Sequence, residues 1–345
     1  MMTSASSMNE YQSVVISVIV IAHNRKNFIL EALKSLLKQT LDRKLFEIIV
    51  VKNFKDQFID EYIEKNSIVS ILCNYDSIGM KMSVGILASK GNILSFLEDD
   101  DRFLENKLNI IYEEFENNDS LVLYRNEYIR VNGFEQSLDL QRNSLKEQIK
   151  LDCLSISKKE MAHILNRHLD IYQSTMSIRK FAILPFLSNI EKIQRGPDIF
   201  WIYSAISTKG EIIFSPKILT IITIHGNNTA STNVTQNIKT LIENRTLLIL
   251  YLLFDYKNIM SLPLNELILK FVKNSIFRWQ LETILYCDNS YYTLSLNKSS
   301  VIRSLIEFHF KFNIPLLLLF IIVSVFPKKL GLVFYSFIIR NLIRL

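Results

Sequence analysis

The sequence predicts an α/β protein: a mostly parallel, Rossmann-like sheet with helices on both faces, followed by a helical C-terminal region. Through the first 130 residues, short runs of aliphatic and β-branched residues alternate with stretches of helical periodicity. Such runs indicate strands buried on both faces, and their alternation with helices favours parallel pairing. From about residue 234 onward nearly every pattern is helical.

The expected elements follow in order along the chain. Buried runs predict strands at Ile16–Ala22, Phe46–Val51, Ile68–Cys73 and Ile93–Leu97. Apolar residues at helical spacing predict helices around residues 28–37, 58–63 and 80–89 and from about residue 104. Farther on, we expect a strand over Leu121–Val131, an extended segment at Gln173–Ser177, and two short strands within Glu211–Ile224 on either side of Ser215-Pro216-Lys217.

Three regions are expected: a sheet domain over residues 14–232, a helical region over 233–311, and apolar, basic-flanked helices over 312–345. In the last region, Ile314–Phe326 and Leu330–Ile339 are uncharged runs of thirteen and ten residues. Both are shorter than the ~20 residues that a spanning helix needs. Because Lys328 and Lys329 separate them, they predict helices that lie on an anionic membrane surface. The alternatives are a buried helical pair or an oligomer contact.

The net charge of +6 and the sequence pI of about 9.0 suit a partner that carries phosphates. Lysines and arginines are scattered among acids, which argues against a nucleic-acid binder. The three cysteines are far apart and form no CxxC pair, which argues against a disulfide framework and a cysteine zinc site. We therefore expect a cytoplasmic protein, peripheral on the inner face of the membrane.

Four consecutive acids, Glu98, Asp99, Asp100 and Asp101, follow the fourth expected strand. Mg²⁺ and Mn²⁺ prefer carboxylate oxygens as ligands. Alternate residues of an extended segment point the same way, so Glu98 and Asp100 can share a target. A helix N-cap would explain Asp100 or Asp101 alone. Four acids together at a strand end predict a metal site.

Three segments carry a family resemblance: SVIVIAHNR at residues 17–25, EIIVV at 47–51, and GNILSFLEDDDRF at 91–103. They resemble glycosyltransferase family 2, which has the GT-A fold. The resemblance covers about residues 14–130, continues more weakly from 198 to about 231, and covers nothing after about 235. It implies that residues 14–232 form a glycosyltransferase domain. It also implies a nucleotide-diphosphate sugar donor and Mg²⁺ or Mn²⁺. If the C-terminal helices lie in the membrane interface, a glycan or lipid-linked sugar at the membrane is the expected acceptor.

The resemblance places the family's acidic motif at Glu98-Asp99-Asp100. Asp100 is then the direct metal ligand, Glu98 lies near the ribose or the metal, Asp99 contributes to nucleotide-sugar binding, and Asp101 supports them. A segment similar to the family's His-x-x-Asn-Ser motif begins at His225, which would complete the metal shell or close over the diphosphate.

Other nucleotide-sugar contacts are implied by the loops after the first strands. The backbone of Ala22 and His23 would lie near the base, and Arg25 near the base or the phosphates. Asn53 stands where the family usually has an acid, so the side chain that would read uracil is replaced by an amide. The remaining implied contacts, beside the diphosphate and sugar, are Gly79 and Lys81. The alternatives are a helix-capping histidine for His23 and a solvated surface lysine for Lys81.

Inverting transfer needs one general base to deprotonate the acceptor. The family places this acid before an aromatic-rich helix about a hundred residues past the metal motif, which corresponds to Asp198. An N-cap would also explain Asp198, and Asp170 and then Glu191 are the next candidates.

Two other functions compete with a transferase. A GT-A-like scaffold without turnover would account for the altered first loop and the missing base-reading acid. Nucleotidyl transfer on a related sheet usually needs a glycine-rich phosphate loop near the N-terminus, and residues 22–26 contain no glycine. An oligomer is compatible with either reading.

Overall fold

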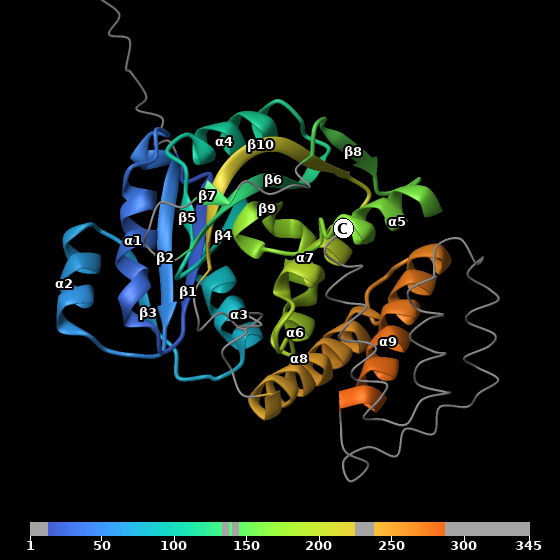
Figure 1. Cartoon of the computed structure of the whole chain (residues 1–345). Coiled ribbons are helices and arrows are strands. Elements are labelled where there is room, and N and C mark those ends of the chain that lie inside the picture. Colours follow the sequence, from blue (N-terminus) through green and yellow to red (C-terminus); the bar gives the residue numbers. More distant parts are fainter. Residues whose placement is uncertain (1–12, 133–137, 140–144, 225–237, 287–345) are drawn as a thin grey trace, which may run out of the picture.

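The computed structural model of the chain describes residues 13–132, 138–139, 145–224 and 238–286 (Figure 1). Its N-terminal half is a parallel sheet in the order β3-β2-β1-β4. These strands are β1 (Ile16–Ala22), β2 (Phe46–Lys52), β3 (Val69–Leu72) and β4 (Ile93–Glu98). The helices between and after them are α1 (Lys26–Leu37), α2 (Gln57–Lys65), α3 (Ile78–Ala88) and α4 (Lys107–Glu116).

The second half extends the same sheet with mixed pairing. Strand β9 (Met176–Arg179) lies antiparallel between β4 and β6 (Leu121–Asn132), and β6 pairs in parallel with β10 (Glu211–Ile224). Short antiparallel strands complete the sheet: β5 (Arg102–Phe103) and β8 (Ile149–Asp152) on β10, and β7 (Leu138–Asp139) on β6. The predicted α/β class is confirmed, with antiparallel strands added beyond β4.

Two local predictions were wrong. Residues Glu211–Ile224 form one strand, because the ladder with β6 continues past Pro216 and Lys217 through a register shift between Ser215 and Ile218. A bulge of this kind accommodates a proline, which has no N–H for the ladder. The segment Gln173–Thr175 is a 3-10 turn (η2), and the extended backbone begins only at Met176.

Helices cover both faces of the sheet. On one face, the β1 side chains Ile16, Val18 and Val20 pack in a core with α1, α2 and α4. On the other, Ile19 and Ile21 belong to a core that includes α3 and the later helices. These later helices are α5 (Lys158–Asn166), α6 (Leu187–Ile190), α7 (Pro197–Ile206), α8 (Ile238–Ile259) and α9 (Glu266–Tyr286). Three further 3-10 turns are η1 (Arg43–Leu45), η3 (Lys180–Ala182) and η4 (Leu184–Phe186).

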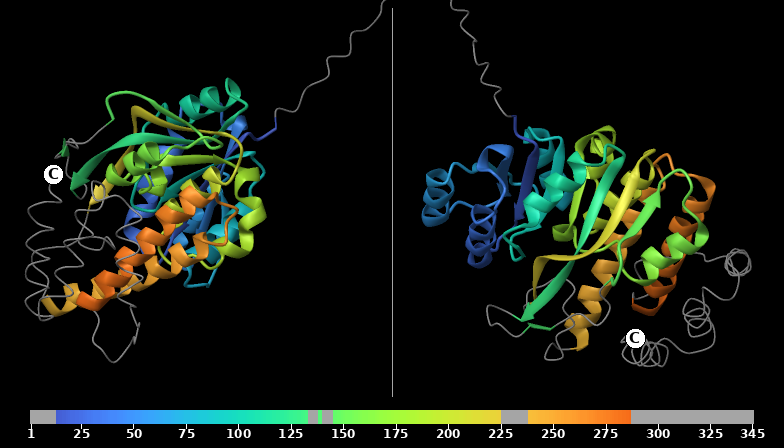
Figure 2. Two further views of the ribbon diagram at one scale, coloured as in Figure 1. Left: turned by 90° about the vertical axis from the view of Figure 1, so that its right-hand side faces the viewer. Right: turned by 90° about the horizontal axis from the view of Figure 1, so that it is seen from above.

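Helices α8 and α9 lie side by side, on the opposite side of the sheet from α1 and α2 (Figure 2). Both fall within the helical region expected over residues 233–311, whose boundaries stay a prediction. None of the helices in the described ranges is long and apolar enough to cross a membrane. The apolar region 312–345 lies outside the described residues.

Candidate active site

The site forms where the parallel strands end. In the register of the sheet, Ile21 of β1 lies beside both Val51 of β2 and Glu98 of β4. The chain therefore leaves β1, β2 and β4 at the same edge, where ligands bind in open α/β sheets. This brings together the loop at 23–25, Asn53, and the acids that follow β4.

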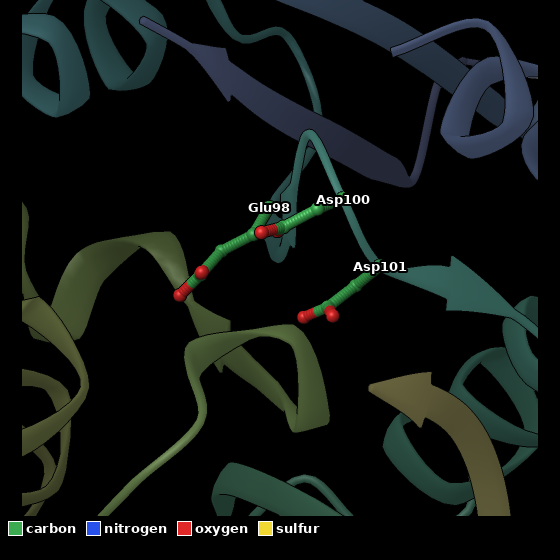
Figure 3. Close-up of side chains that lie close together, drawn as sticks. All are labelled: Glu98, Asp100 and Asp101. Atoms are coloured by element: carbon green, nitrogen blue, oxygen red, sulfur yellow. The ribbon is translucent and has the colours of Figure 1, made fainter. Parts of the chain in front are cut away.

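The acids after β4 form a tight turn, closed by the N–H of Asp101, which donates to the carbonyl of Glu98 at 3.1 Å. The turn places Glu98, Asp100 and Asp101 on one side (Figure 3), with one carboxylate oxygen of each within 4.8 Å of the others. The predicted pairing of Glu98 and Asp100 therefore gains Asp101 as a third member. These three residues are called the acidic turn below.

Arg25 ties the first loop to this turn. Its guanidinium pairs with Asp99 and, at 2.7 Å, with Oδ2 of Asp100. Asp99 is fully buried and also accepts the backbone N–H of His23, while its Oδ2 has no hydrogen-bond partner among the described residues. Burial is the largest cause that raises the pKa of Asp99, to about 7. Arg25 therefore links the first loop to the acidic turn through ion pairs. Its contact with a base or a phosphate stays a prediction.

The acidic turn carries more negative charge than its surroundings neutralise. Burial, followed by repulsion from Asp100 and Asp198, raises the pKa of Glu98 to about 7. Burial and the neighbouring acids also raise the pKa of Asp101 well above its ordinary value. Clustered oxygen ligands that resist ionisation fit a hard divalent cation, because its charge would favour their ionised forms.

Neighbouring side chains fix the orientation of these acids. Gln173 donates from Nε2 to Glu98 Oε1 at 3.2 Å, and the backbone N–H of Thr223 donates to Asp101 Oδ1 at 3.1 Å. Both donors lie on segments distant in sequence, η2 and β10. The turn is therefore oriented by the second half of the sheet as well as by β4.

Asp198 lies in the first turn of α7, where its carboxylate accepts two backbone N–H groups. Oδ1 accepts from Ile199 at 3.0 Å and Oδ2 from Tyr172 at 2.9 Å. Burial raises the pKa of Asp198 to about 7. Its negative charge is one of the causes that raise the pKa of Glu98, so the fold brings Asp198 to the acidic turn across 100 residues of sequence.

The comparisons with known proteins bear on the family and the fold. Residues 17–185 match a family model described as Glycosyl transferase family 2. Residues 17–185 are therefore a glycosyltransferase family 2 domain. A search of curated protein sequences finds no significant match.

Solved structures of S. aureus TarS share the fold of this glycosyltransferase. TarS 1–349 in complex with UDP-GlcNAc superposes with a TM-score of 0.55 at 17% identity, over 78% of this chain and 73% of that chain. The complex of the same fragment with UDP gives a TM-score of 0.54 at 16% identity, over 90% and 81%. The longer TarS structure gives a TM-score of 0.54 at 17% identity, and 47% of its length is covered. At these identities the likeness shows the fold, and it confirms the GT-A-like architecture.

The first loop of the glycosyltransferase is closed by two amides. Asn53 accepts the backbone N–H of Asn24 at Oδ1 and donates from Nδ2 to Asn24 Oδ1, both at 2.9 Å. Asn24 has a left-handed backbone with φ of 56°, which asparagine tolerates better than most residues. Asn53 therefore shapes the loop that follows Ala22, the buried last residue of β1. Its contact with a base stays a prediction.

His23 and Lys81 meet at the same edge, with Nδ1 of His23 and Nζ of Lys81 2.7 Å apart. Lys81 is buried, so the surface-loop alternative for this lysine does not hold. Burial lowers the pKa of Lys81, and burial with the nearby Lys81 charge lowers that of His23. A neutral imidazole that accepts from the ammonium is the arrangement that these shifts favour.

Gly79 lies in the first turn of α3, where a Cβ would be 1.9 Å from the carbonyl oxygen of Ile190. Its N–H donates to the carbonyl of Ile193 at 3.1 Å. Close packing of α3 on the segment that includes α6 therefore explains this glycine. Its predicted approach to the diphosphate remains untested.

The alternative bases occupy different surroundings. Asp170 is buried, which raises its pKa to about 6, and its charge is one of the causes that raise the pKa of Asp198. Glu191 accepts a hydrogen bond from Ser83 Oγ at 3.2 Å, against α3. Of these three acids, Asp198 alone is among the causes that raise the pKa of Glu98, which supports it as the first candidate. His225 lies outside the described residues.

Sequence reasoning missed Lys107, which is fully buried on α4. Its Nζ donates to the carbonyl of Ser174 at 2.6 Å and to Thr220 Oγ1 at 2.9 Å, and lies 3.7 Å from the centre of the Phe103 ring. Burial lowers the pKa of Lys107 well below its ordinary value, and the charge of Asp101 partly opposes this shift. The spacing of Lys107 could have indicated this burial, because it lies four and eight residues before the buried Ile111 and Phe115 on the same face of α4.

Proposed function

We propose that this glycosyltransferase carries out metal-dependent, inverting transfer of a sugar from a nucleotide-diphosphate donor to a hydroxyl or phosphate acceptor. The observation that carries the proposal is the acidic turn, in which each residue offers one carboxylate oxygen within 4.8 Å of the others. The charge of Asp198 is among the causes that raise the pKa of Glu98 in this turn. A metal–diphosphate platform beside a single carboxylate base is what a one-step displacement requires.

Asp100 and Glu98 are proposed to hold Mg²⁺ or Mn²⁺, with Asp101 in support and His225 completing the shell. When bound, such a cation neutralises charge that develops on the departing diphosphate. The hard oxygen donors and the raised pKa values of Glu98 and Asp101 support this assignment.

Asp198 is proposed as the general base. The acceptor oxygen forms a bond to the anomeric carbon as the bond from that carbon to the diphosphate breaks, and the acceptor proton moves to Asp198. A pKa of about 7 allows the carboxylate to be ionised and still basic near neutral pH. The N–H groups of Tyr172 and Ile199 hold it in place through the reaction.

The donor is proposed to be a UDP-sugar, because the fold matches TarS structures that contain UDP-GlcNAc and UDP. His23, with the backbone of Ala22, and Asn53 are the proposed base contacts, while Arg25, Lys81 and Gly79 serve the phosphates and sugar. Asp99 acts by holding Arg25. The acceptor is proposed to be a membrane-linked glycan or lipid-linked sugar, reached when residues 312–345 bind the inner membrane surface.

Hydrolysis of a panel of nucleotide sugars, beginning with UDP-GlcNAc, in the presence of Mn²⁺ tests this function. The wild-type chain should release nucleoside diphosphate, and EDTA should abolish the release. Asp198→Asn should retain donor binding and lose about 10²- to 10⁴-fold in turnover. Donor binding without turnover in the wild-type chain would instead favour the scaffold, and no binding or hydrolysis with any divalent metal would reject the enzyme.

A further inference from the structure

A buried carboxylate of the C-terminal helices binds the backbone of the loop that leads into α7. This loop, residues 194–196, is called the gripped loop below. Asp255 of α8 is 2% exposed. Its Oδ1 accepts the N–H of Gln194 at 2.8 Å, and its Oδ2 accepts those of Arg195 at 2.9 Å and Gly196 at 2.8 Å. Consecutive backbone N–H groups that converge in this way form an anion-binding concavity. Here the anion is a side chain of the same protein.

The gripped loop leads directly to the candidate base. Gly196 is the N-cap of α7, Pro197 is the first residue of this helix, and Asp198 is the second. The ring of Pro197 fixes its φ, so little freedom separates the loop from the base. The N–H groups that Asp255 binds therefore set where α7 begins and where the Asp198 carboxylate lies.

The chain just before the gripped loop is held from the other side. The carbonyl of Ile193 accepts from the N–H of Gly79 at 3.1 Å and from Ser77 Oγ at 3.0 Å. Helix α3 therefore fixes residue 193, while α8 fixes residues 194–196. Among these contacts, only those of Asp255 come from the C-terminal helices.

An aspartate is better suited to this position than a neutral isostere. A carboxylate offers two acceptor oxygens, whereas an asparagine amide offers one oxygen and points two donors at N–H groups. Asp255→Asn would leave buried N–H groups without acceptors, which the loop can relieve only by moving. Movement of about 1 Å at a reacting group can reduce the rate about 10²-fold.

We infer that Asp255 is a positioning residue for glycosyl transfer: it places Asp198 by fixing residues 194–196, which makes helix α8 a working part of the active site. The inference rests on the proposed role of Asp198 as general base.

Asn258, one turn along α8, offers a matched control. It donates from Nδ2 to the carbonyl of Asn189 at 2.7 Å and accepts from Asn189 Nδ2 at 2.9 Å. Asn258→Ala thus removes two other hydrogen bonds between α8 and the sheet domain, both to Asn189 of α6, and changes no contact of the gripped loop. Both variants should lower the melting temperature.

The test compares steady-state hydrolysis by the full chain with Mn²⁺ and the best nucleotide sugar of the panel, starting from UDP-GlcNAc. Asp255→Asn should lower kcat about 10²-fold with KM for the donor little changed. Asn258→Ala should keep kcat within about twofold at a comparable loss of melting temperature. Asp255→Glu, which keeps the charge, should retain more kcat than Asp255→Asn, and it replaces that variant in the comparison with Asn258→Ala if Asp255→Asn does not fold.

Equal kcat in the Asp255 and Asn258 variants would overturn the inference, and so would a loss that falls on KM alone. Asp198→Asn, measured in parallel, separates this failure from that of the proposed function. If Asp198→Asn loses turnover while the Asp255 variants do not, only the positioning role fails. If Asp198→Asn keeps full turnover, the proposed base itself is wrong.

Discussion

Asp198 combines two fixed hydrogen bonds with a pKa that burial raises to about 7. A general base works only when ionised, so activity should fall as the pH drops through that value. We expect kcat/KM to rise with pH along a limb centred near pH 7. Asp170→Asn should move this limb to lower pH without abolishing it, because the charge of Asp170 is one of the causes that raise the pKa of Asp198. A rate–pH profile that loses its acid limb in Asp170→Asn would transfer the role of base to Asp170.

The acids after β4 give a prediction on stability. Burial raises the pKa of Glu98 and Asp99 to about 7 and that of Asp101 well above its ordinary value. Their ordinary values are near 4. Because the folded chain binds these protons more tightly than the unfolded chain, the stability they contribute is full below about pH 4 and is lost as the pH rises through about 7. Without metal, the melting temperature should therefore fall between pH 5 and pH 7.5.

Mn²⁺ should reverse that loss, since it binds the ionised carboxylates of the folded state. The rise in melting temperature on adding Mn²⁺ should be larger at pH 7.5 than at pH 5. Asp101→Asn removes a buried carboxyl group whose ionisation the fold disfavours, so it should stabilise the metal-free chain at pH 7.5 and shrink the Mn²⁺ effect. Asp119→Asn, an exposed acid in a turn after α4, is the control and should change neither. An equal Mn²⁺ effect in Asp101→Asn would exclude this residue from the metal site.

At the scale of elements, the approach of α3 to the segment around α6 depends on Gly79. A Cβ there would be 1.9 Å from the carbonyl oxygen of Ile190, a contact that backbone must move to relieve. Gly79→Ala should therefore lower the free energy of unfolding by about 1–3 kcal/mol. At Gly196 the nearest atom to a Cβ is a side-chain carbon of Ile199 at 3.3 Å, so Gly196→Ala should cost less. Denaturant titration of both variants measures the difference. Unchanged stability of Gly79→Ala with a raised donor KM would support the diphosphate role instead.

The elements that the sequence predicted well are those whose signals are local. Strands such as Ile16–Ala22 are buried on both faces, so every residue is apolar or small. Such a run can be recognised from the local sequence alone. Strand Glu211–Ile224 was divided wrongly because Ser215-Pro216-Lys217 has the composition of a turn, while its pairing with β6 is a long-range property. The acids after β4 were found because they adjoin a clear strand end.

Residues that act through distant contacts could not be predicted. Tyr172, with φ of 67°, donates its N–H to Asp198, and nothing in its local sequence marks a strained backbone. Asp255 lies among apolar residues of a helix, and its partners are sixty residues away along the chain. In each case the residue is visible in the sequence, but its hydrogen-bond partner is known only from the packing of the folded chain.

In the whole molecule, the helices after residue 237 share the core of the sheet domain. Ile249, Leu253 and Ile259 of α8, and Val272 of α9, are buried in the same cluster as sheet residues such as Leu94 and Phe96. The helical pair thus covers the sheet face opposite α1 and supplies the carboxylate that grips the start of α7. Removal of residues 238–286 should therefore expose apolar core as well as release Asp198.

The sequence beyond residue 311 bears on whether the enzyme acts at a membrane surface. Its two uncharged runs are too short to span a membrane, and Lys328, Lys329 and Arg340 flank them. The chain should sediment with vesicles that contain phosphatidylglycerol, and more weakly as salt rises, because basic residues contribute about 1 kcal/mol each near an anionic surface. A chain that ends at residue 311 should not sediment, yet should still hydrolyse the donor, since the acidic turn and Asp198 lie within residues 13–224.

A Lys328→Ser/Lys329→Ser variant separates the contribution of charge from that of apolar burial. It should lose the salt-sensitive part of the membrane binding and keep the rest. Equal sedimentation of the full and shortened chains would place the membrane contact within residues 1–311.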